Sequence, residues 1–122
     1  MKAKKSLGQN FLIDNNIITK ISNIIDVSKN DLIIEIGPGM GALTNELKKK
    51  KCSIICYELD TDLKKCLDIV EDDKTKIIYK DILKANIKFS NFIFNIKISF
   101  SITIYFLLSF SISFILFQRL LF

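Results

Sequence analysis

The stretch Leu32-Ile33-Ile34-Glu35-Ile36-Gly37-Pro38-Gly39-Met40-Gly41 decides how this chain folds. Its first half is a β-branched apolar run, typical of a buried strand, and its second half is glycine-rich, typical of a tight turn. Residues 42–49 follow, with Leu43 and Leu47 one helical turn apart and lysines at the end, where cations favour the helix dipole. The stretch therefore predicts a strand, a glycine turn and a helix.

The flanking segments continue this alternation of helices and strands. Upstream, isoleucines line one face of a predicted helix over 15–25, and Asp14 is its expected N-cap. Downstream, apolar runs predict strands over 53–57 and 77–79, separated by a helical pattern over 62–70. Strands that alternate with helices in this way indicate an α/β fold with a parallel sheet and crossover helices.

Small or acidic residues follow each predicted strand, and in an open parallel sheet the ligand lies beyond the carboxyl ends of the strands. The first strand is followed by Gly37, Gly39 and Gly41, which let backbone amides and a helix N-terminus approach a ligand closely. Glu58 ends the second strand, about where dinucleotide-binding folds place the carboxylate that holds a ribose diol. Asp81 ends the third, where a carboxylate could accept a hydrogen bond from an exocyclic amine. Together these residues predict an adenosine pocket.

Each of these features has a plainer interpretation when it is taken alone. A glycine-rich turn is more often structural punctuation, and the spacing Gly-x-Gly-x-Gly is not the dinucleotide fingerprint. An acidic residue at a strand end is more often a solvated charge. The pocket is favoured because the three glycines and two carboxylates follow successive strands in the right order.

Composition limits the classes of protein to consider. The chain has 122 residues, 49% of them hydrophobic and 25% charged, which suits one small domain. Its net charge of +5 favours an anionic partner such as nucleic acid or a membrane surface. The absence of histidine excludes Ser-His-Asp and Cys-His catalysis, and three cysteines without a CxxC spacing predict no metal site and no disulfide framework. The first five residues resemble neither a secretory signal nor a presequence, so we expect an intracellular protein.

The composition changes abruptly near residue 92. Only Lys97 and Arg119 carry charge within 92–122, and most of the phenylalanines lie there. We therefore expect a domain over 1–96 and an apolar low-complexity tail over 97–122.

The motifs of the first part resemble those of a known family, the small-subunit ribosomal RNA adenine dimethyltransferases, also called the kasugamycin-sensitivity methyltransferases. The resemblance covers about residues 2–96 and depends on the order and spacing of four segments: Lys5-Ser6-Leu7-Gly8-Gln9-Asn10-Phe11-Leu12, Glu35-Ile36-Gly37-Pro38-Gly39-Met40-Gly41-Ala42-Leu43-Thr44, Tyr57-Glu58-Leu59-Asp60 and Lys80-Asp81-Ile82-Leu83. The related erythromycin-resistance methylases usually have Gly-Ser/Thr-Gly-Lys-Gly in the glycine turn, which favours the small-subunit enzymes.

The resemblance implies a Rossmann-like class I methyltransferase that uses S-adenosylmethionine. It would dimethylate N6 of two adjacent adenines near the 3′ end of small-subunit rRNA, in a pre-30S-type particle. The implied protein is bacterial or organellar in type, acts in the cytoplasm or an organelle, needs no metal and is a monomer if soluble.

The resemblance also implies roles for individual residues. The cofactor contacts would be Asn10, Leu12, Gly37, Gly39, Gly41, Glu58, Asp81 and Asn95. Among them, Gly37 would lie against the methionine part, Glu58 would bind the ribose hydroxyls and Asp81 would meet the adenine amine. Asn95 would also be the catalytic residue that orients the target amine. The basic N-terminus (Lys2, Lys4 and Lys5) would either touch RNA phosphate or only aid solubility.

The catalytic motif departs from the family pattern of Asn-Leu/Ile-Pro-Tyr/Phe. Residues 92–94 are expected to form the fourth strand and Asn95-Ile96 match the motif, but Lys97-Ile98 replace the proline and the aromatic residue. The aromatic residue would stack on the flipped base, so we expect weak activity.

Three explanations fit the composition of the segment after residue 96. A frame change at about 96–98 in an A/T-rich gene would give such a composition. A membrane segment is the second, because no charge occurs within 98–117. The third is a strand, because Ile98, Phe100, Ile102 and Ile104 alternate with more polar residues. The alternative functions are accordingly a non-catalytic cofactor- or RNA-binding remnant and a small membrane-anchored protein.

Overall fold

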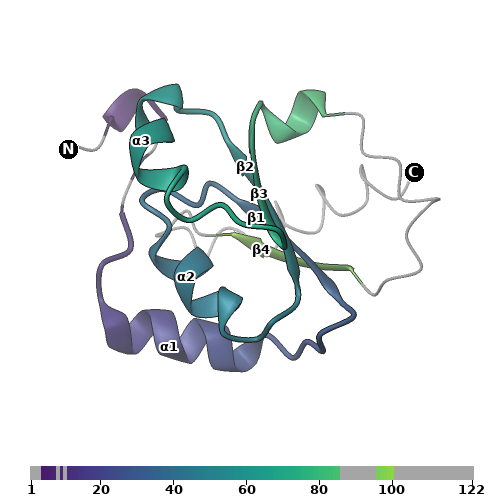
Figure 1. Ribbon diagram of the computed structural model, residues 1–122. Coiled ribbons are helices and arrows are strands. Elements are labelled where there is room, and N and C mark those ends of the chain that lie inside the picture. The colour runs from purple at the N-terminus through teal and green to yellow at the C-terminus, as the bar shows by residue number, and fades with distance from the viewer. Residues whose placement is uncertain (1–3, 8, 10, 86–95, 101–122) are drawn as a thin grey trace.

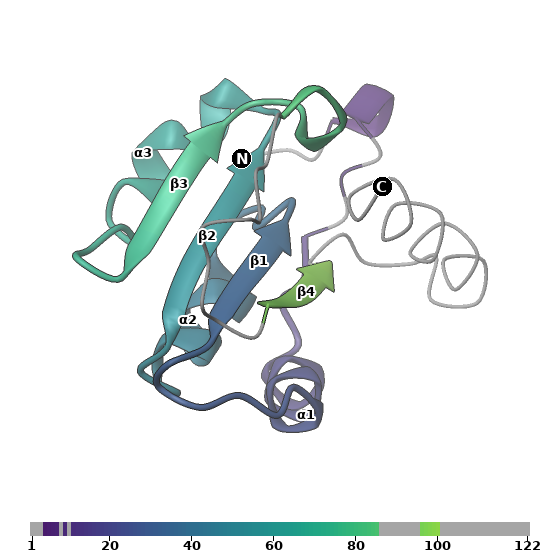
Figure 2. The ribbon, with the colours of Figure 1, turned by 90° about the vertical axis from the view of Figure 1, so that its right-hand side faces the viewer.

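The computed structural model describes residues 4–7, 9, 11–85 and 96–100, and its centre is a parallel four-stranded sheet. The strands are β1 (Leu32–Ile36), β2 (Ser53–Glu58), β3 (Thr75–Tyr79) and β4 (Ile96–Phe100). Their order in space is β3-β2-β1-β4, and every neighbouring pair is parallel (Figure 2). The predicted α/β fold with a parallel sheet is confirmed.

The helical elements alternate with these strands. They are η1 (Lys5–Leu7), α1 (Asn15–Ile24), α2 (Ala42–Lys48), η2 (Thr61–Leu63), α3 (Lys64–Leu67) and η3 (Ile82–Lys84). Asp14 is the N-cap of α1, because its carboxylate accepts hydrogen bonds from the backbone N–H groups of Asn16 (2.8 Å) and Ile17 (3.2 Å).

The helix predicted over 62–70 is wrong in its extent. The segment begins as the 3₁₀ turn η2, and α3 is a single turn that ends at Leu67. Asp60 starts this segment by accepting a hydrogen bond from the backbone N–H of Asp62 at 3.1 Å, which favours a tight turn over a longer helix.

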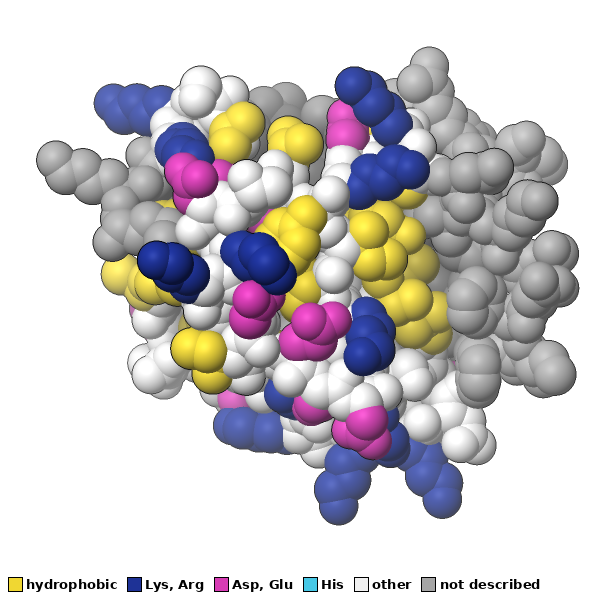
Figure 3. Space-filling view, turned by 45° about the horizontal axis from the view of Figure 1, so that its top comes forward, with side chains coloured by type: hydrophobic (Ala, Val, Ile, Leu, Met, Phe, Trp, Pro, Cys, Tyr) yellow, Lys and Arg dark blue, Asp and Glu magenta, His cyan; other side chains and the backbone are white. Residues whose placement is uncertain are grey.

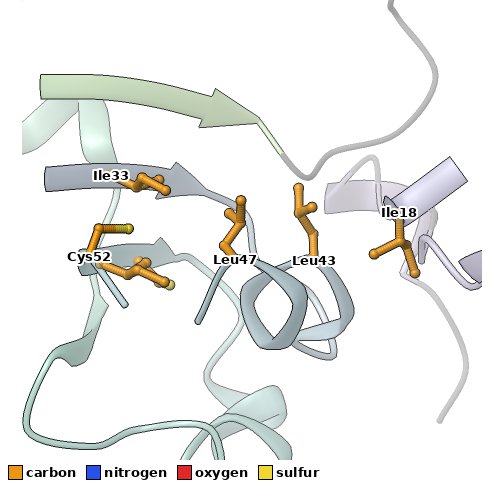
Figure 4. Close-up of a cluster of buried hydrophobic side chains, with 7 residues drawn as sticks. Ile18, Ile33, Leu43, Leu47 and Cys52 are labelled. Atoms are coloured by element: carbon orange, nitrogen blue, oxygen red, sulfur yellow. The ribbon is translucent and has the colours of Figure 1, made fainter. Parts of the chain in front are cut away.

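Helices α1, α2 and α3 lie on one face of the sheet (Figure 1). The core between them and the strands consists of Ile18, Ile33, Leu43, Leu47, Cys52, Ile54 and Cys56 (Figure 4). Leu43 and Leu47, the pair that predicts α2, are at most 1% exposed. All five residues of β1 are buried, as expected for a central strand of a parallel sheet.

The opposite face of the sheet has its own apolar cluster. Leu32, Ile34 and Tyr57 form its buried part, and Ile55 and Ile78 pack beside them half-buried. β1 therefore contributes side chains to both faces.

The fourth strand corrects the expected boundary between the domain and its tail. The strand predicted at 92–94 lies outside the described residues, whereas β4 spans Ile96–Phe100 and pairs with the whole of β1. Residues 97–100, assigned to the tail from composition, thus belong to the sheet. The alternation of apolar and polar residues from Ile96 to Phe100 suits a strand, so the strand interpretation holds for these residues.

The frame-change and membrane explanations concern residues that, apart from 96–100, lie outside the described part of the chain. Among the residues that the structure describes, no helix is long and apolar enough to cross a bilayer.

Candidate functional site

The order of the strands marks where a ligand site is expected. From β1 the chain builds β2 and then β3 on one side, and β4 lies on the other side of β1. Such a reversal is a topological switch point, and the crevice beyond the carboxyl ends of the strands is the usual ligand site there. The glycine turn that follows β1 lies at this point.

The glycine turn has a conformation that few other residues could adopt. Gly37, Gly39 and Gly41 have φ angles of 68°, 59° and 81°, in the left-handed region. A Cβ on Gly41 would lie 2.9 Å from Cγ2 of Val70, and one on Gly39 would lie 3.3 Å from Cδ1 of Phe11. Both glycines are therefore required by backbone conformation and by close neighbours.

Glu58, at the end of β2, reaches across to this turn. One of its carboxylate oxygens, Oε2, accepts a hydrogen bond from the N–H of Gly39 at 3.2 Å. The other, Oε1, accepts from the N–H groups of Leu59 (2.9 Å) and Asp60 (2.8 Å). Glu58 is only 6% exposed, and these donors stabilise its buried charge. Because a carboxylate has about four acceptor positions, the group can still accept from a ligand hydroxyl.

Asp81, at the end of β3, is held by a local contact. Its Oδ1 accepts from the N–H of Leu83 at 3.0 Å and caps η3, and the residue is half-buried. The three strand ends predicted to form the pocket thus lie at one edge of the sheet. Gly39 and Glu58 are in direct contact, whereas the hydrogen bond of Asp81 stays within its own turn.

Two of the predicted cofactor contacts, Asn10 and Asn95, lie outside the described residues. Leu12 is half-buried and packs against the core cluster, so the structure gives this side chain a packing role. Phe11, which the sequence analysis gave no role, lies against Gly39.

Sequence reasoning also missed a polar network around Asp60. The Asp60 carboxylate binds Nζ of Lys4 at 2.7 Å and Nε2 of Gln9 at 2.6 Å, and Lys4 also binds Asp62 at 2.6 Å. Hydrogen bonds from Lys4 and Gln9 lower the pKa of Asp60, and those to Asp60 and Asp62 raise the pKa of Lys4. The basic N-terminus and the acidic end of the Tyr57-Glu58-Leu59-Asp60 motif were the available signal. Lys4 is thus committed to an ion pair within the chain.

A second polar cluster lies beneath the turn. Glu35 is fully buried in β1, and its Oε2 accepts a hydrogen bond from Oγ1 of Thr44 in α2 at 2.7 Å. The thiol of Cys56 lies 3.6 Å from the same oxygen, and burial raises the pKa of this thiol far above its ordinary value. Cys56 is therefore a protonated, unreactive thiol.

On the face shown in Figure 3, the acidic and basic side chains of the described residues are interspersed. Within the described ranges, no group of three or more cysteine or acidic residues is placed to hold a metal ion.

A sheet of this order, with a glycine turn at its switch point and an acid at the end of the next strand, defines a class of protein. That class is the Rossmann-like methyltransferases, whose cofactor is S-adenosylmethionine. Solved structures agree: the 23S rRNA methyltransferase ErmE superposes with a TM-score of 0.54 at 29% identity, over 62% of this chain and 32% of that one. A dimethyladenosine transferase from Plasmodium falciparum shares the fold, with a TM-score of 0.61 at 21% identity over 86% of this chain and 37% of that one.

Within that class the chain belongs to the ribosomal RNA adenine dimethylase family, whose model matches residues 1–122. This match extends beyond residue 96, where the motif resemblance ends.

Curated relatives named ribosomal RNA small subunit methyltransferase A support the family. The protein of Listeria innocua is 44% identical over 69% of this chain and 29% of its own length. That of Levilactobacillus brevis is 48% identical over 70% and 29%, and that of Mycoplasma mycoides is 46% identical over 72% and 34%. The chain thus spans about a third of the length of the curated relatives it matches.

Proposed function

We propose that this chain is the S-adenosylmethionine-binding part of an enzyme that dimethylates N6 of two adjacent adenines near the 3′ end of small-subunit rRNA. The substrate would be a pre-30S-type particle in the cytoplasm. Family membership supports the reaction. The observation that carries the proposal is the 3.2 Å hydrogen bond between the Gly39 N–H and the Glu58 carboxylate, which joins the two main cofactor motifs at the switch point.

The residues present fit this cofactor. In the proposed arrangement, the glycine turn lets the methionine part approach the backbone, and Glu58 accepts the ribose hydroxyls. Asp81 accepts the adenine amine from the β3 end. The carboxylate of Glu58 is already held by three backbone N–H groups, so little side-chain entropy remains to be lost on binding.

Catalysis in this proposal depends on the alignment of the target amine with the methyl group. S-adenosylmethionine, when bound, supplies an electrophilic methyl group on a sulfonium. Asn95 would accept a hydrogen bond from the target adenine amine and orient that amine for the transfer, and the proton that N6 loses would leave to water. No general base with a raised pKa is needed, because alignment supplies most of the rate.

The test is calorimetric titration of S-adenosylmethionine into the 122-residue chain. We expect micromolar binding by the wild type and loss of at least about a hundredfold in affinity for Glu58→Ala, since hydrogen bonds to a charged group contribute about 1.5–3 kcal/mol each. Glu46→Ala is the matched control, because Glu46 lies on α2 and pairs with Lys49 at its surface. Absence of binding by the wild type, or equal loss in both variants, would contradict the proposal.

A second candidate is cofactor binding without methyl transfer. It is favoured by the register of β4, in which Lys97 pairs with Ile33 and Ile98 with Ile34. The positions where the family motif has proline and an aromatic residue thus continue the strand in this chain. Transfer of labelled methyl groups to unmethylated small subunits separates the candidates, because only the enzyme would label the rRNA.

A further inference from the structure

The N-terminal segment and the end of β2 meet at one buried carboxylate, that of Asp60. We propose that Asp60 is a positioning residue. Its carboxylate captures the N-terminal segment through Lys4 and Gln9, while its backbone N–H fixes Glu58. Docking of the N-terminal segment would then be energetically coupled to the shape of the cofactor pocket. This inference rests on the proposed cofactor function and adds residues that the motifs do not assign.

The contacts on the carboxylate side are short and complementary. Oδ1 of Asp60 lies 2.7 Å from Nζ of Lys4, and Oδ2 lies 2.6 Å from Nε2 of Gln9. The Gln9 side chain is itself oriented, because its Oε1 accepts from the N–H of Lys4 at 2.8 Å. Lys4 therefore donates to one oxygen of the Asp60 carboxylate, and Gln9 donates to the other.

The burial of Asp60 raises the free-energy cost of losing these contacts. Its side chain is 4% exposed, whereas that of Lys4 is 41% exposed. A buried carboxylate that loses its cation is left with an uncompensated charge, which is strongly unfavourable. The N-terminal segment is thus held against β2 by a partner that cannot easily be replaced by water.

The backbone of Asp60 connects the contacts made by Lys4 and Gln9 to the pocket. The Asp60 N–H donates to Oε1 of Glu58 at 2.8 Å, and Oε2 of Glu58 accepts from Gly39. The captured segment leads on to Phe11, whose ring lies against Gly39. The segment therefore reaches the glycine turn by two routes, through Glu58 and through Phe11.

The contacts of Lys4 and Gln9 with Asp60 can break while the rest of the protein stays folded. Among the residues that the structure describes, 4–7 and 9 belong to neither apolar core cluster, and Leu12 is the first that packs against one. Segments with few apolar contacts open locally at a lower free-energy cost than the core. Substitutions at Lys4 should accordingly weaken the pocket and spare the fold.

The first experiment measures S-adenosylmethionine affinity for Lys4→Met, Lys4→Arg and Asp60→Asn in the 122-residue chain. We expect Lys4→Met and Asp60→Asn to raise Kd by about tenfold and Lys4→Arg to stay near wild type. The double variant should be no weaker than either single one, because both remove the same contact. Lys64→Met is the control, since Lys64 forms a comparable but exposed pair with Asp68.

A second measurement separates positioning from a general structural effect. Hydrogen exchange of the Leu59 and Asp60 amides, which donate to Glu58, should accelerate in Lys4→Met while exchange in β1 stays unchanged. Unchanged exchange at these amides, or an equal Kd effect in Lys64→Met, would overturn the inference. The outcome is distinct from that of the proposed function: a wild type that binds no cofactor defeats the function, whereas the exchange test still decides the coupling.

Discussion

The two predicted carboxylates of the pocket are held in different ways. Glu58 at the end of β2 is buried and bonded to the backbone of another loop. Asp81 at the end of β3 is half-buried and, among the described residues, its carboxylate bonds only within its own turn, by the hydrogen bond that caps η3. A carboxylate fixed by a neighbouring element is preorganised, while one that caps its own turn can turn toward a ligand at small cost. In the proposed pocket, the ribose side is therefore more fully preorganised in the folded protein than the adenine side.

The strongest way to break the preorganised side is to add a methyl group at Gly41. Gly41→Ala would place a Cβ 2.9 Å from Val70 at a φ of 81°. Left-handed strain of about 1–2 kcal/mol and overpacking of about 1–3 kcal/mol together predict a loss of about 3 kcal/mol in the free energy of unfolding. Urea denaturation measures it.

The matched control for this change is Asn45→Ala in the same helix. Asn45 is exposed, and alanine has the higher helix propensity, so unchanged or slightly raised stability is expected. Equal stability of Gly41→Ala and wild type would show that the turn can relax, and that it is less rigid than its contacts indicate.

A smaller effect is expected from the polar contact beneath the turn. Thr44→Val keeps the shape of the side chain but removes the donor to the buried carboxylate of Glu35. Leaving a buried acceptor short of a partner predicts a loss of about 2 kcal/mol, again measured in urea. Thr19→Val, on the exposed side of α1, should change stability by much less. Equal effects at both threonines would mean that the contact does not hold α2 to β1.

The comparison is tested directly by amide variants at the two strand ends. Glu58→Gln should raise the Kd for S-adenosylmethionine about thirtyfold, because the amide group cannot accept from all three backbone donors. Asp81→Asn should raise it only about threefold, because asparagine still caps η3 and still accepts from an amine. Calorimetry of both variants decides this. Equal losses would contradict the idea that only the β2 end is preorganised.

Local patterns explain which parts of this fold were predictable. β1, the glycine turn and α2 follow from one stretch, since a β-branched apolar run, turn chemistry and helix spacing are all encoded between residues 32 and 48. The start of α1 was predictable because its cap, Asp14, is next to it in sequence. The strand expected at 92–94 stays a prediction, because these residues lie outside the described part of the chain; β4 begins at Ile96, where the apolar run has no turn residue to mark a start.

Contacts between distant segments could not be predicted in the same way. Lys4 and Asp60 carry charges that many other partners could satisfy, and nothing in the sequence around either residue specifies that they pair. The same holds for Glu35, a buried acidic residue of β1 that accepts a hydrogen bond from Thr44, which α2 brings to it. The positions of the pocket carboxylates were predictable from the strand ends, but what holds them was not.

The smallest predicted effect concerns acid stability and compares the two edges of the sheet. Lys4 and Gln9 lower the pKa of Asp60 at the carboxyl edge, and Lys48 lowers that of Asp72 to about 2 at the other edge. Both acids stay ionised in the folded protein at pH values where the unfolded chain takes up protons. Their stabilisation is therefore complete above pH ~4 and is lost as the pH falls through the folded pKa values.

Urea denaturation between pH 7 and pH 2.5 should show this decline, and variants should assign it to each edge. Asp60→Asn should flatten the decline most and Lys4→Met less, because Gln9 still donates to Asp60 when Lys4 is replaced. Asp72→Asn should flatten it independently, since its partner Lys48 is in α2. If Lys4→Met left the decline as steep as in the wild type, Asp60 would owe its low pKa to Gln9 and to its own turn. The Lys4 ion pair would then contribute nothing to the acid stability of the β2 end.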